Sequence, residues 1–183
     1  NSNLTGANLT SANLKDANVK KVDFTSADLT NAKFKGVDIS MGYLSTMNLT
    51  KADLSGAILT NADLSEMDLT AANLSGQDLS GHDIANTILT GATLTDVILP
   101  SGVLSGKNFE WTKFHGVDLS GEDMSLSKFQ YASFDNANME NTNLSNAELI
   151  QVDFTKIKNK SLAGAVLFGT SFAYSNLTDV DLS

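Results

Sequence analysis

Large apolar residues recur at every fifth position along the chain. From Leu4 to Phe154 every fifth residue is Leu, Val, Phe, Ile or Met, and the series resumes at Leu162 and runs to Leu182. We call each of these residues a centre. The residue two before a centre is usually small, the residue one before is usually Asn or Asp, and the residue after is usually Ser or Thr. The pattern predicts a chain built from five-residue units.

A period of five fits neither an α-helix nor a continuous β-strand. On a helix it rotates successive centres by about 140°, which spreads them around the whole circumference. On a strand an odd period moves each centre to the opposite face. Gly or Asn is frequent two residues after a centre, where some turns require a positive φ. The chain is therefore predicted to turn once in every unit, so that centres and small residues both point inward.

The spacing of the bulkiest residues predicts four units per coil. Like side chains stack when the distance between them is one coil, and three series are twenty residues apart: Phe114, Phe134 and Phe154; Phe109 and Phe129; Trp111 and Tyr131. A three-residue slip at Lys158–Lys160 predicts a short loop near residues 157–161. We expect one domain over residues 1–183, an all-β solenoid with a square cross-section and about nine coils of four repeats.

The units resemble those of the pentapeptide-repeat family, whose motif is Ala-(Asp/Asn)-Leu-(Ser/Thr)-x. Residues 52–56 (Ala-Asp-Leu-Ser-Gly) and 7–11 (Ala-Asn-Leu-Thr-Ser) match it, and the resemblance extends from Ser2 to Ser183. The resemblance implies a right-handed quadrilateral β-helix. The family also contains quinolone-resistance and mycobacterial gyrase-interacting proteins, which mimic DNA and bind type II topoisomerase, and repeat domains of bacterial secreted effectors.

Composition argues against several classes of function. The 183 residues carry a net charge of −9, and all 12 basic residues are lysine, which argues against direct nucleic-acid binding. The absence of cysteine excludes disulfides and thiolate metal sites. No apolar run approaches the roughly 20 residues of a membrane span, and a rod filled with side chains offers no catalytic cleft. We expect no enzyme activity, no cofactor, no membrane partner and, with His82 and His115 on different faces, no metal site.

Four positions that usually hold a small inward residue carry long polar side chains: Gln77, His82, Lys107 and Glu122. His82 and Glu122 share a column two coils apart, with Gly102 between them. One interpretation is a buried polar site with a His–Glu pair bridged by water. The other is that these side chains bend outward at a bulge or meet backbone carbonyls, and we favour it because a solenoid interior tolerates hydrogen-bonded polar groups.

The middle of the chain is acidic. Residues 52–106 contain no lysine and seven acids, which we call the acidic band: Asp53, Asp63, Glu66, Asp68, Asp78, Asp83 and Asp96. One interpretation is a mimic of nucleic-acid phosphate. The other is that an Asp one residue before a centre supports the turn through side-chain-to-backbone hydrogen bonds. This second interpretation accounts for five of the seven acids.

Outward apolar residues indicate where a partner binds. Trp111 and Tyr131 stack in one column with Leu126 at the neighbouring corner, and aromatic anchors dominate binding hot spots. Other outward apolar residues are scattered along the rod: Tyr43, Ile58, Ile88, Ile98, Val103, Ile150, Phe168 and Tyr174. No cap is recognisable after Leu182, and solenoid ends need covering. We therefore expect either a further segment or a homodimer through the C-terminal end.

The leading hypothesis is a non-catalytic, cytoplasmic scaffold that presents an acidic, partly aromatic surface to a protein partner. The resemblance adds two alternatives, a DNA-mimic inhibitor or protector of gyrase and a repeat domain of a bacterial secreted effector. The series of centres up to Phe154 lacks the inserted loops of the quinolone-resistance branch, which weighs against gyrase. The salt dependence of partner binding distinguishes the scaffold from the DNA mimic. A DNA mimic binds its partner more weakly at high salt, whereas binding through an aromatic surface is nearly insensitive to salt.

Overall fold

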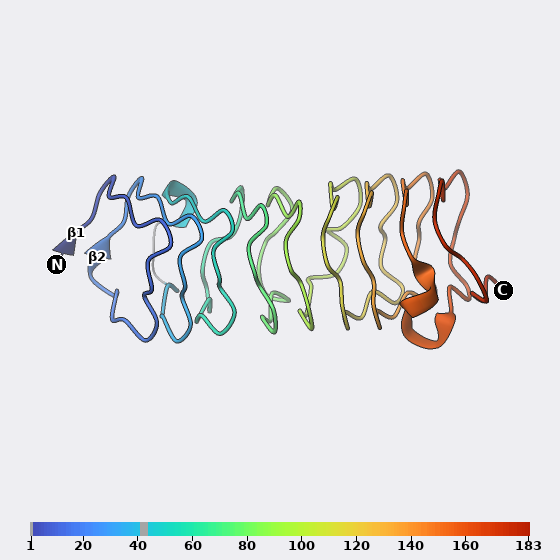
Figure 1. The fold of residues 1–183 in the computed structure, drawn as a ribbon, viewed down its shortest axis with the longest axis horizontal. Coiled ribbons are helices and arrows are strands. Elements are labelled where there is room, and N and C mark those ends of the chain that lie inside the picture. Colours follow the sequence, from blue (N-terminus) through green and yellow to red (C-terminus); the bar gives the residue numbers. More distant parts are fainter. Residues whose placement is uncertain (1, 41–43) are drawn as a thin grey trace.

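The computed structural model describes residues 2–40 and 44–183, which form an elongated solenoid (Figure 1). Successive coils lie side by side along the rod, with the N-terminal coils at one end and the C-terminal coils at the other. Regular elements are short: strands β1 (Ser2–Asn3) and β2 (Val22–Asp23), and 3-10 helices η1 (Leu44–Thr46), η2 (Phe154–Lys156) and η3 (Lys158–Lys160). Order in this fold therefore comes from pairing between coils rather than from long strands or helices.

Neighbouring coils are joined by parallel main-chain bridges between residues twenty positions apart. Asp53, for example, bridges to Lys33 in the preceding coil and to Asn73 in the following one. The Asp53 N–H donates to the carbonyl of Ala32 at 2.8 Å, and the Leu54 N–H donates to the carbonyl of Asn73 at 2.8 Å. Because each unit turns after one bridged residue, the pairing does not extend into long strands.

The outward residues that precede the centres fall into four columns. We name them columns A to D, and their first members are Asn3, Asn8, Asn13 and Asn18. Column C is bridged at every step from residue 13 to residue 133, whereas the bridges in columns B and D are interrupted at some steps. In column A, no bridge joins residues 63, 83, 103 and 123, all of which the structure describes. The rod is therefore tightly paired along column C and looser along column A.

The centres form an apolar core in which aromatic rings stack from coil to coil. The ring centroids of Phe109 and Phe129 are 5.4 Å apart, and those of Phe114 and Phe134 are 5.1 Å apart. Phe154 continues the second stack at 6.1 Å. All five rings are fully buried. Like residues twenty positions apart therefore lie on top of one another, as their spacing in the sequence predicts.

Most units turn through a residue with positive φ, and an Asn or Asp side chain supports the turn. Two residues after their centres, Gly56 has a φ of 72° and Asn61 a φ of 60°. Asp118 Oδ1 accepts hydrogen bonds from the N–H of Ser120 at 3.1 Å and from its hydroxyl at 2.7 Å. The Ser120 hydroxyl, followed by its N–H, holds the pKa of Asp118 below its ordinary value. The turns thus depend on side chains that accept hydrogen bonds just before the centre.

Helix η3 changes the register. Residues paired across it are 23 positions apart, as Asn143 is from Val166 and Asp153 is from Asn176. Inside η3, Asn159 has a positive φ of 55°. Because three residues are looped out, Leu162 becomes the next centre and is fully buried. The slip in the sequence pattern at residues 158–160 is thus a local loop, after which the repeat continues.

Asp118→Asn is expected to make the stability of the protein less dependent on pH. The folded pKa of Asp118 is lowered, so its stabilising effect is complete above the unfolded pKa of about 3.9 and is lost as the pH falls through the folded pKa. Asparagine still accepts the turn hydrogen bond, as Asn48 does from Thr50, but it does not titrate. Urea unfolding at neutral pH and at about pH 3 should show a smaller loss of unfolding free energy in the variant. Equal losses in both proteins would contradict this account.

Candidate protein-binding surface

Trp111 and Tyr131 form a stacked aromatic pair at the corner between columns B and C. Their ring centroids are 4.1 Å apart and their planes differ by 22°. The Trp111 side chain is 58% exposed and that of Tyr131 is 36% exposed. The backbone fixes both residues, because the Trp111 N–H donates to Gln130 O at 3.0 Å and the Tyr131 N–H donates to Ile150 O at 3.1 Å. The aromatic pair is therefore an exposed platform on a hydrogen-bonded corner.

Both residues of the aromatic pair adopt a backbone conformation that bulky side chains rarely take. The φ angle is 64° at Trp111 and 61° at Tyr131, in the corner position that Gly or Asn often fills. Leu126 and Tyr174 share this conformation, with φ angles of 61° and 60°. Residues in unfavourable backbone conformations cluster at functional sites. These bulky corner residues are thus the places where the sequence departs furthest from what the turn itself favours.

Leu126 lies at the corner between columns A and B, so column B separates it from Tyr131. Lys128 is exposed between the two corners. The register across η3 places Tyr174 in the corner column of the aromatic pair, after Gln151, and Gly169 in the corner column of Leu126. Phe168 directly precedes Gly169, and both Phe168 and Tyr174 are exposed. The sequence places Leu126 at the corner next to the pair, but the alignment of Tyr174 with the corner column of the pair emerges only once the three-residue loop is counted.

The acidic band surrounds the rod and does not line a single face. Its members occupy all four columns and two of the corners. The carboxylates therefore point in different directions around the middle coils. Asp63 and Asp83 lie in column A, Asp68 in column B, Asp53 in column C and Asp78 in column D, while Glu66 and Asp96 lie at corners.

The five aspartates of the acidic band that lie in columns also support turns. Asp63 Oδ1 accepts hydrogen bonds from the Ser65 N–H at 3.0 Å and from the Ser65 hydroxyl at 2.6 Å. That hydroxyl, more than the N–H, lowers the pKa of Asp63, and Ser80 lowers the pKa of Asp78 in the same way. Asp53, Asp68 and Asp83 likewise accept a hydrogen bond from the backbone N–H two residues later. These carboxylates therefore have a structural role whether or not they bind a partner.

The four long polar residues of the interior each bind the backbone of the residue twenty positions earlier. We call them the side-chain rungs. Gln77 is buried, and the other three are partly buried. The contacts are Gln77 Nε2 to Ala57 O at 3.0 Å, His82 Nδ1 to Ala62 O at 3.0 Å, Lys107 Nζ to Thr87 O at 3.2 Å, and Gly102 N–H to Glu122 Oε2 at 3.1 Å.

Three of the side-chain rungs stand where a main-chain bridge is missing. In a regular step, the residue before a centre donates its N–H to the carbonyl 21 positions earlier. Asp78, Asp83 and Asn108 make no such bond, although they and their expected acceptors are described. The carbonyls left free are those that Gln77, His82 and Lys107 bind. Because a buried carbonyl without a donor is costly, the polar side chains satisfy the backbone where the coils separate.

No direct ion pair joins His82 and Glu122 among the described residues. Each binds its own backbone partner, and Gly102, which lies between them, donates its N–H to Glu122. The Lys107 amine donates to a second carbonyl, that of Ala85, at 2.7 Å. Burial lowers the pKa of Lys107, and the charge of Asp83 partly offsets this effect. Gln77, His82 and Lys107 thus meet backbone carbonyls, whereas Glu122 accepts a hydrogen bond from a backbone N–H.

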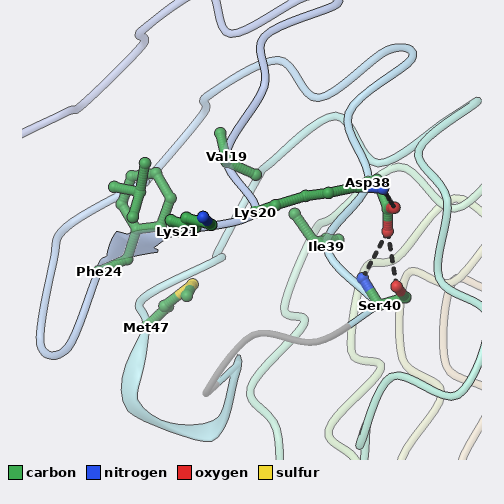
Figure 2. Close-up of a pocket in the computed structure, with 9 residues that line it drawn as sticks. Val19, Lys20, Lys21, Phe24, Asp38, Ile39, Ser40 and Met47 are labelled. Carbon is green, nitrogen blue, oxygen red and sulfur yellow. Dashed lines mark hydrogen bonds and ion pairs between the residues drawn. The ribbon is translucent and has the colours of Figure 1, made fainter. Parts of the chain in front are cut away.

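A cavity of about 420 Å³ lies beside the coil that precedes η1. At its rim the Lys20 amine is 3.4 Å from Asp38 Oδ2, and Asp38 also accepts hydrogen bonds from Ser40. The cavity has room for a small apolar group, but none of the residues singled out from the sequence lines it. Tyr43 lies outside the described residues. The apolar wall, shown in Figure 2, includes Val19, Phe24, Ile39 and Met47.

Residues 2–40 and 44–183 contain no group of three or more His, Asp or Glu side chains placed to hold a metal ion. No helix within these ranges is long and apolar enough to cross a membrane. The ring of His115 hydrogen bonds to the hydroxyl of Ser133, and that of His82 to a carbonyl. Both histidines therefore have protein partners.

Comparison with known families identifies the repeat. The sequence profile of pentapeptide repeats matches residues 2–40, 48–83, 68–106 and 123–158, in 8 copies. The chain belongs to the pentapeptide repeat family. Pentapeptide repeat proteins are right-handed quadrilateral β-helices, and the four columns with a twenty-residue register agree with this architecture.

Several solved structures of pentapeptide repeat proteins are similar to this chain. QnrB1, a plasmid-mediated fluoroquinolone resistance protein, is 16% identical over 96% of this chain and 89% of its own, with a TM-score of 0.45. HetL, involved in heterocyst differentiation in the cyanobacterium Nostoc, is 24% identical over 96% and 74%, with a TM-score of 0.23. A protein of the Arabidopsis thaliana thylakoid lumen is 28% identical over 66% and 68%, with a TM-score of 0.27. No curated protein sequence matches the chain.

Gln77→Leu is expected to lower the free energy of unfolding by about 1–3 kcal/mol. The variant keeps the side-chain volume but removes the hydrogen bonds to Leu54 O and Ala57 O, and it leaves the Ala57 carbonyl without a donor. Gln151→Leu is the matched control, because Gln151 is exposed at a corner. Urea unfolding should separate the variants, with the control within about 0.5 kcal/mol of the wild type. Equal effects of the two substitutions would show that Gln77 is not a rung.

Proposed function

We propose that the protein is a non-catalytic scaffold that binds another protein through the aromatic pair. The observation that carries this proposal is the exposed stack of Trp111 on Tyr131, held in a backbone conformation that suits Gly or Asn better. In the proposal the rod is a quadrilateral β-helix of about nine coils of four repeats, and it serves as the rigid support. Leu126 extends the binding surface across column B.

Physical arguments favour this corner as the place of contact. Trp and Tyr are enriched among residues that dominate binding energy. Side chains that are already stacked lose little conformational freedom on binding, which reduces the entropic cost of association. The surrounding residues Asn108, Lys128 and Glu148 of column B are polar and exposed, as is typical of the rim of an interface.

Family membership supports a binding role. Pentapeptide repeat proteins are generally non-enzymatic scaffolds. In this chain the side-chain rungs, the largest set of inward polar groups that the sequence singles out, all bind backbone atoms. The cytoplasmic location, the secreted-effector alternative and a homodimer through the C-terminal end stay predictions from the sequence.

A second candidate is a DNA mimic that inhibits or protects gyrase. One observation favours it: the acidic band occupies all four columns over a stretch without lysine, so carboxylates surround the rod as phosphates surround a duplex. The turn-supporting role of five of these carboxylates accounts for the same residues without a partner. The aromatic pair has no part in this candidate, so the two functions predict different sensitive residues.

Trp111→Ala is expected to remove partner binding while leaving the fold intact, because Trp111 lies outside the core. Immobilised wild-type and variant proteins would be compared by quantitative capture from an extract of the source cells. Loss of a hot-spot Trp costs about 2 kcal/mol or more, so specific partners should be retained at least about tenfold less. Ile98→Ala is the matched control, because Ile98 is 57% exposed but lies in column D. Equal retention by both variants would refute the aromatic pair as the binding surface.

The gyrase candidate makes a separate prediction. If it is right, the protein inhibits DNA supercoiling by gyrase at micromolar concentration, and inhibition weakens as salt is raised. Replacing Asp63, Asp68, Asp78 and Asp83 together by Asn should abolish inhibition, since Asn keeps the turn acceptor but carries no charge. Trp111→Ala should leave inhibition unchanged. No inhibition at low or high salt would eliminate this candidate.

A further inference from the structure

The cavity of about 420 Å³ lies where the first two coils separate along column D (Figure 2). No bridge joins Asn18 to Asp38, although the structure describes both residues, whereas Asp38 is bridged to Ile58 in the following coil. The position that a side-chain rung would occupy at this step holds Val37, which is apolar and fully buried. The cavity is therefore a gap between coils that no rung closes.

The separation of the coils leaves main-chain donors beside the cavity. In a closed step of column D, the centre donates its N–H to the carbonyl 19 positions later, as Leu119 does to Asn138 at 2.9 Å. Val19 is the centre beside the cavity, and its N–H donates neither to Asp38 nor to any other acceptor in the described part of the chain. The N–H of Lys21, which also lines the cavity, has no acceptor there either. Both groups are available to an acceptor from outside the chain.

The interior of the cavity is apolar and has the size of a small-molecule site. Phe24 and Ile39 form part of the wall and are 5% and 4% exposed, and the partly buried Val22 and Met47 complete it. Ligand pockets in proteins typically measure about 300–1,000 Å³, and an apolar cavity of about 150 Å³ already takes up benzene. The wall therefore suits a short aliphatic group.

The charged residues that line the cavity are two lysines and one aspartate. Lys20 extends to Asp38 in Figure 2, and its amine is 3.4 Å from Asp38 Oδ2. The Ser40 hydroxyl, followed by its N–H, holds the pKa of Asp38 below its ordinary value, so Asp38 is ionised at neutral pH and offsets Lys20. Lys21 forms none of the three ion pairs in the described part of the chain. One positive charge at the cavity is thus left without a partner.

The other acids near Lys21 in the sequence are engaged outside the cavity. Asp16 is 3.9 Å from the amine of Lys15. Asp23 Oδ1 accepts hydrogen bonds from the Thr25 N–H at 2.9 Å and from the Thr25 hydroxyl at 2.6 Å. Neither acid lines the cavity. The charge balance at the cavity therefore favours an anionic group over a cationic one.

We propose that the cavity binds a small aliphatic carboxylate. The amine of Lys21 holds the carboxylate group, the N–H groups of Val19 and Lys21 are further donors to it, and the aliphatic chain lies against Phe24 and Ile39. Hydrogen bonds from charged or main-chain donors to a carboxylate are strong, and each buried methylene group adds to the affinity. The cavity lies in the first coils of the rod, away from the aromatic pair, so the inference goes beyond the proposed scaffold function and does not depend on it (Figure 1).

The test uses octanoate as the probe and isothermal titration calorimetry as the measurement. We expect saturable binding of octanoate to a single site per chain. Octanol has the same aliphatic chain but no charge, and it should bind at least about threefold more weakly. Acetate has the same charge but no chain to bury, and it should bind at least about tenfold more weakly.

NMR of methyl-labelled methionine locates the bound probe. The chain has 5 methionines, and Met47 lines the cavity, whereas Met124 and Met139 are buried in later coils. Octanoate should shift the Met47 signal, assigned with Met47→Leu, and leave those of Met124 and Met139 in place. Shifts at Met124 or Met139 without a shift at Met47 would place the probe elsewhere and overturn the proposal.

Lys21→Gln is the decisive variant, because it removes the unpaired charge while the apolar wall stays in place. It should raise the Kd for octanoate about threefold to tenfold, and Lys21→Arg should bind nearly as well as the wild type. Lys51→Gln is the matched control, since Lys51 is an exposed lysine at the corner between columns B and C and does not line the cavity. Val19→Phe should weaken binding by filling the cavity. Circular dichroism and urea unfolding would verify that each variant is folded.

The outcomes separate this inference from the proposed function. No saturable binding of octanoate, equal binding of octanoate and octanol, or the same Kd in Lys21→Gln and Lys51→Gln overturns the inference. Trp111→Ala should bind octanoate as the wild type does, and Lys21→Gln should retain captured protein partners. Loss of partners in Trp111→Ala together with failure of octanoate to bind would leave the scaffold proposal standing and remove only the carboxylate site.

Discussion

Main-chain pairing between residues twenty positions apart is the constraint on which this structure depends. It is satisfied only if every unit turns by a similar amount, so the small residue, the Asn or Asp before the centre and the residue with positive φ act together. Once the register is set, each side chain has its neighbours in its own column. The buried rings of Phe114 and Phe134 stack for the same reason that Trp111 and Tyr131 stack at the surface. The same repeat therefore sets the neighbours of the side chains in the core and of those at the surface.

The side-chain rungs show how the constraint is relaxed without leaving the backbone unpaired. Along column C the bridges continue from coil to coil, whereas along column A they are missing in the middle of the rod. Bridges are also missing at single steps of columns B and D, and at one missing step in each of columns D, A and B the side chains of Gln77, His82 and Lys107 bind the carbonyls that are released. A side chain spans a wider gap than a peptide N–H, so the coils separate locally at little cost in hydrogen bonds. Polar groups inside a solenoid therefore need not indicate catalysis.

Much of the fold could be predicted from the sequence because a period of five leaves few options. The inward position of the centres, the twenty-residue stacking and the slip at residues 158–160 all follow from counting residues. Counting cannot show whether a main-chain bridge persists at a given step, so the partners of Gln77 and Lys107 emerged only from the structure.

The position of the aromatic pair in this repeat argues that it is more than a stray apolar patch. A corner residue with positive φ is best filled by Gly or Asn, so Trp111 and Tyr131 carry a conformational cost that folding does not require. Their stacking recovers part of that cost, but it does so by exposing a large apolar edge to water. Replacement of Trp111 and Tyr131 by Asn would remove both the conformational cost and the exposed apolar edge, and it would keep the turn. A contact made outside the chain is the interaction that would offset them, and the corner between columns B and C presents the rings where such a contact can form.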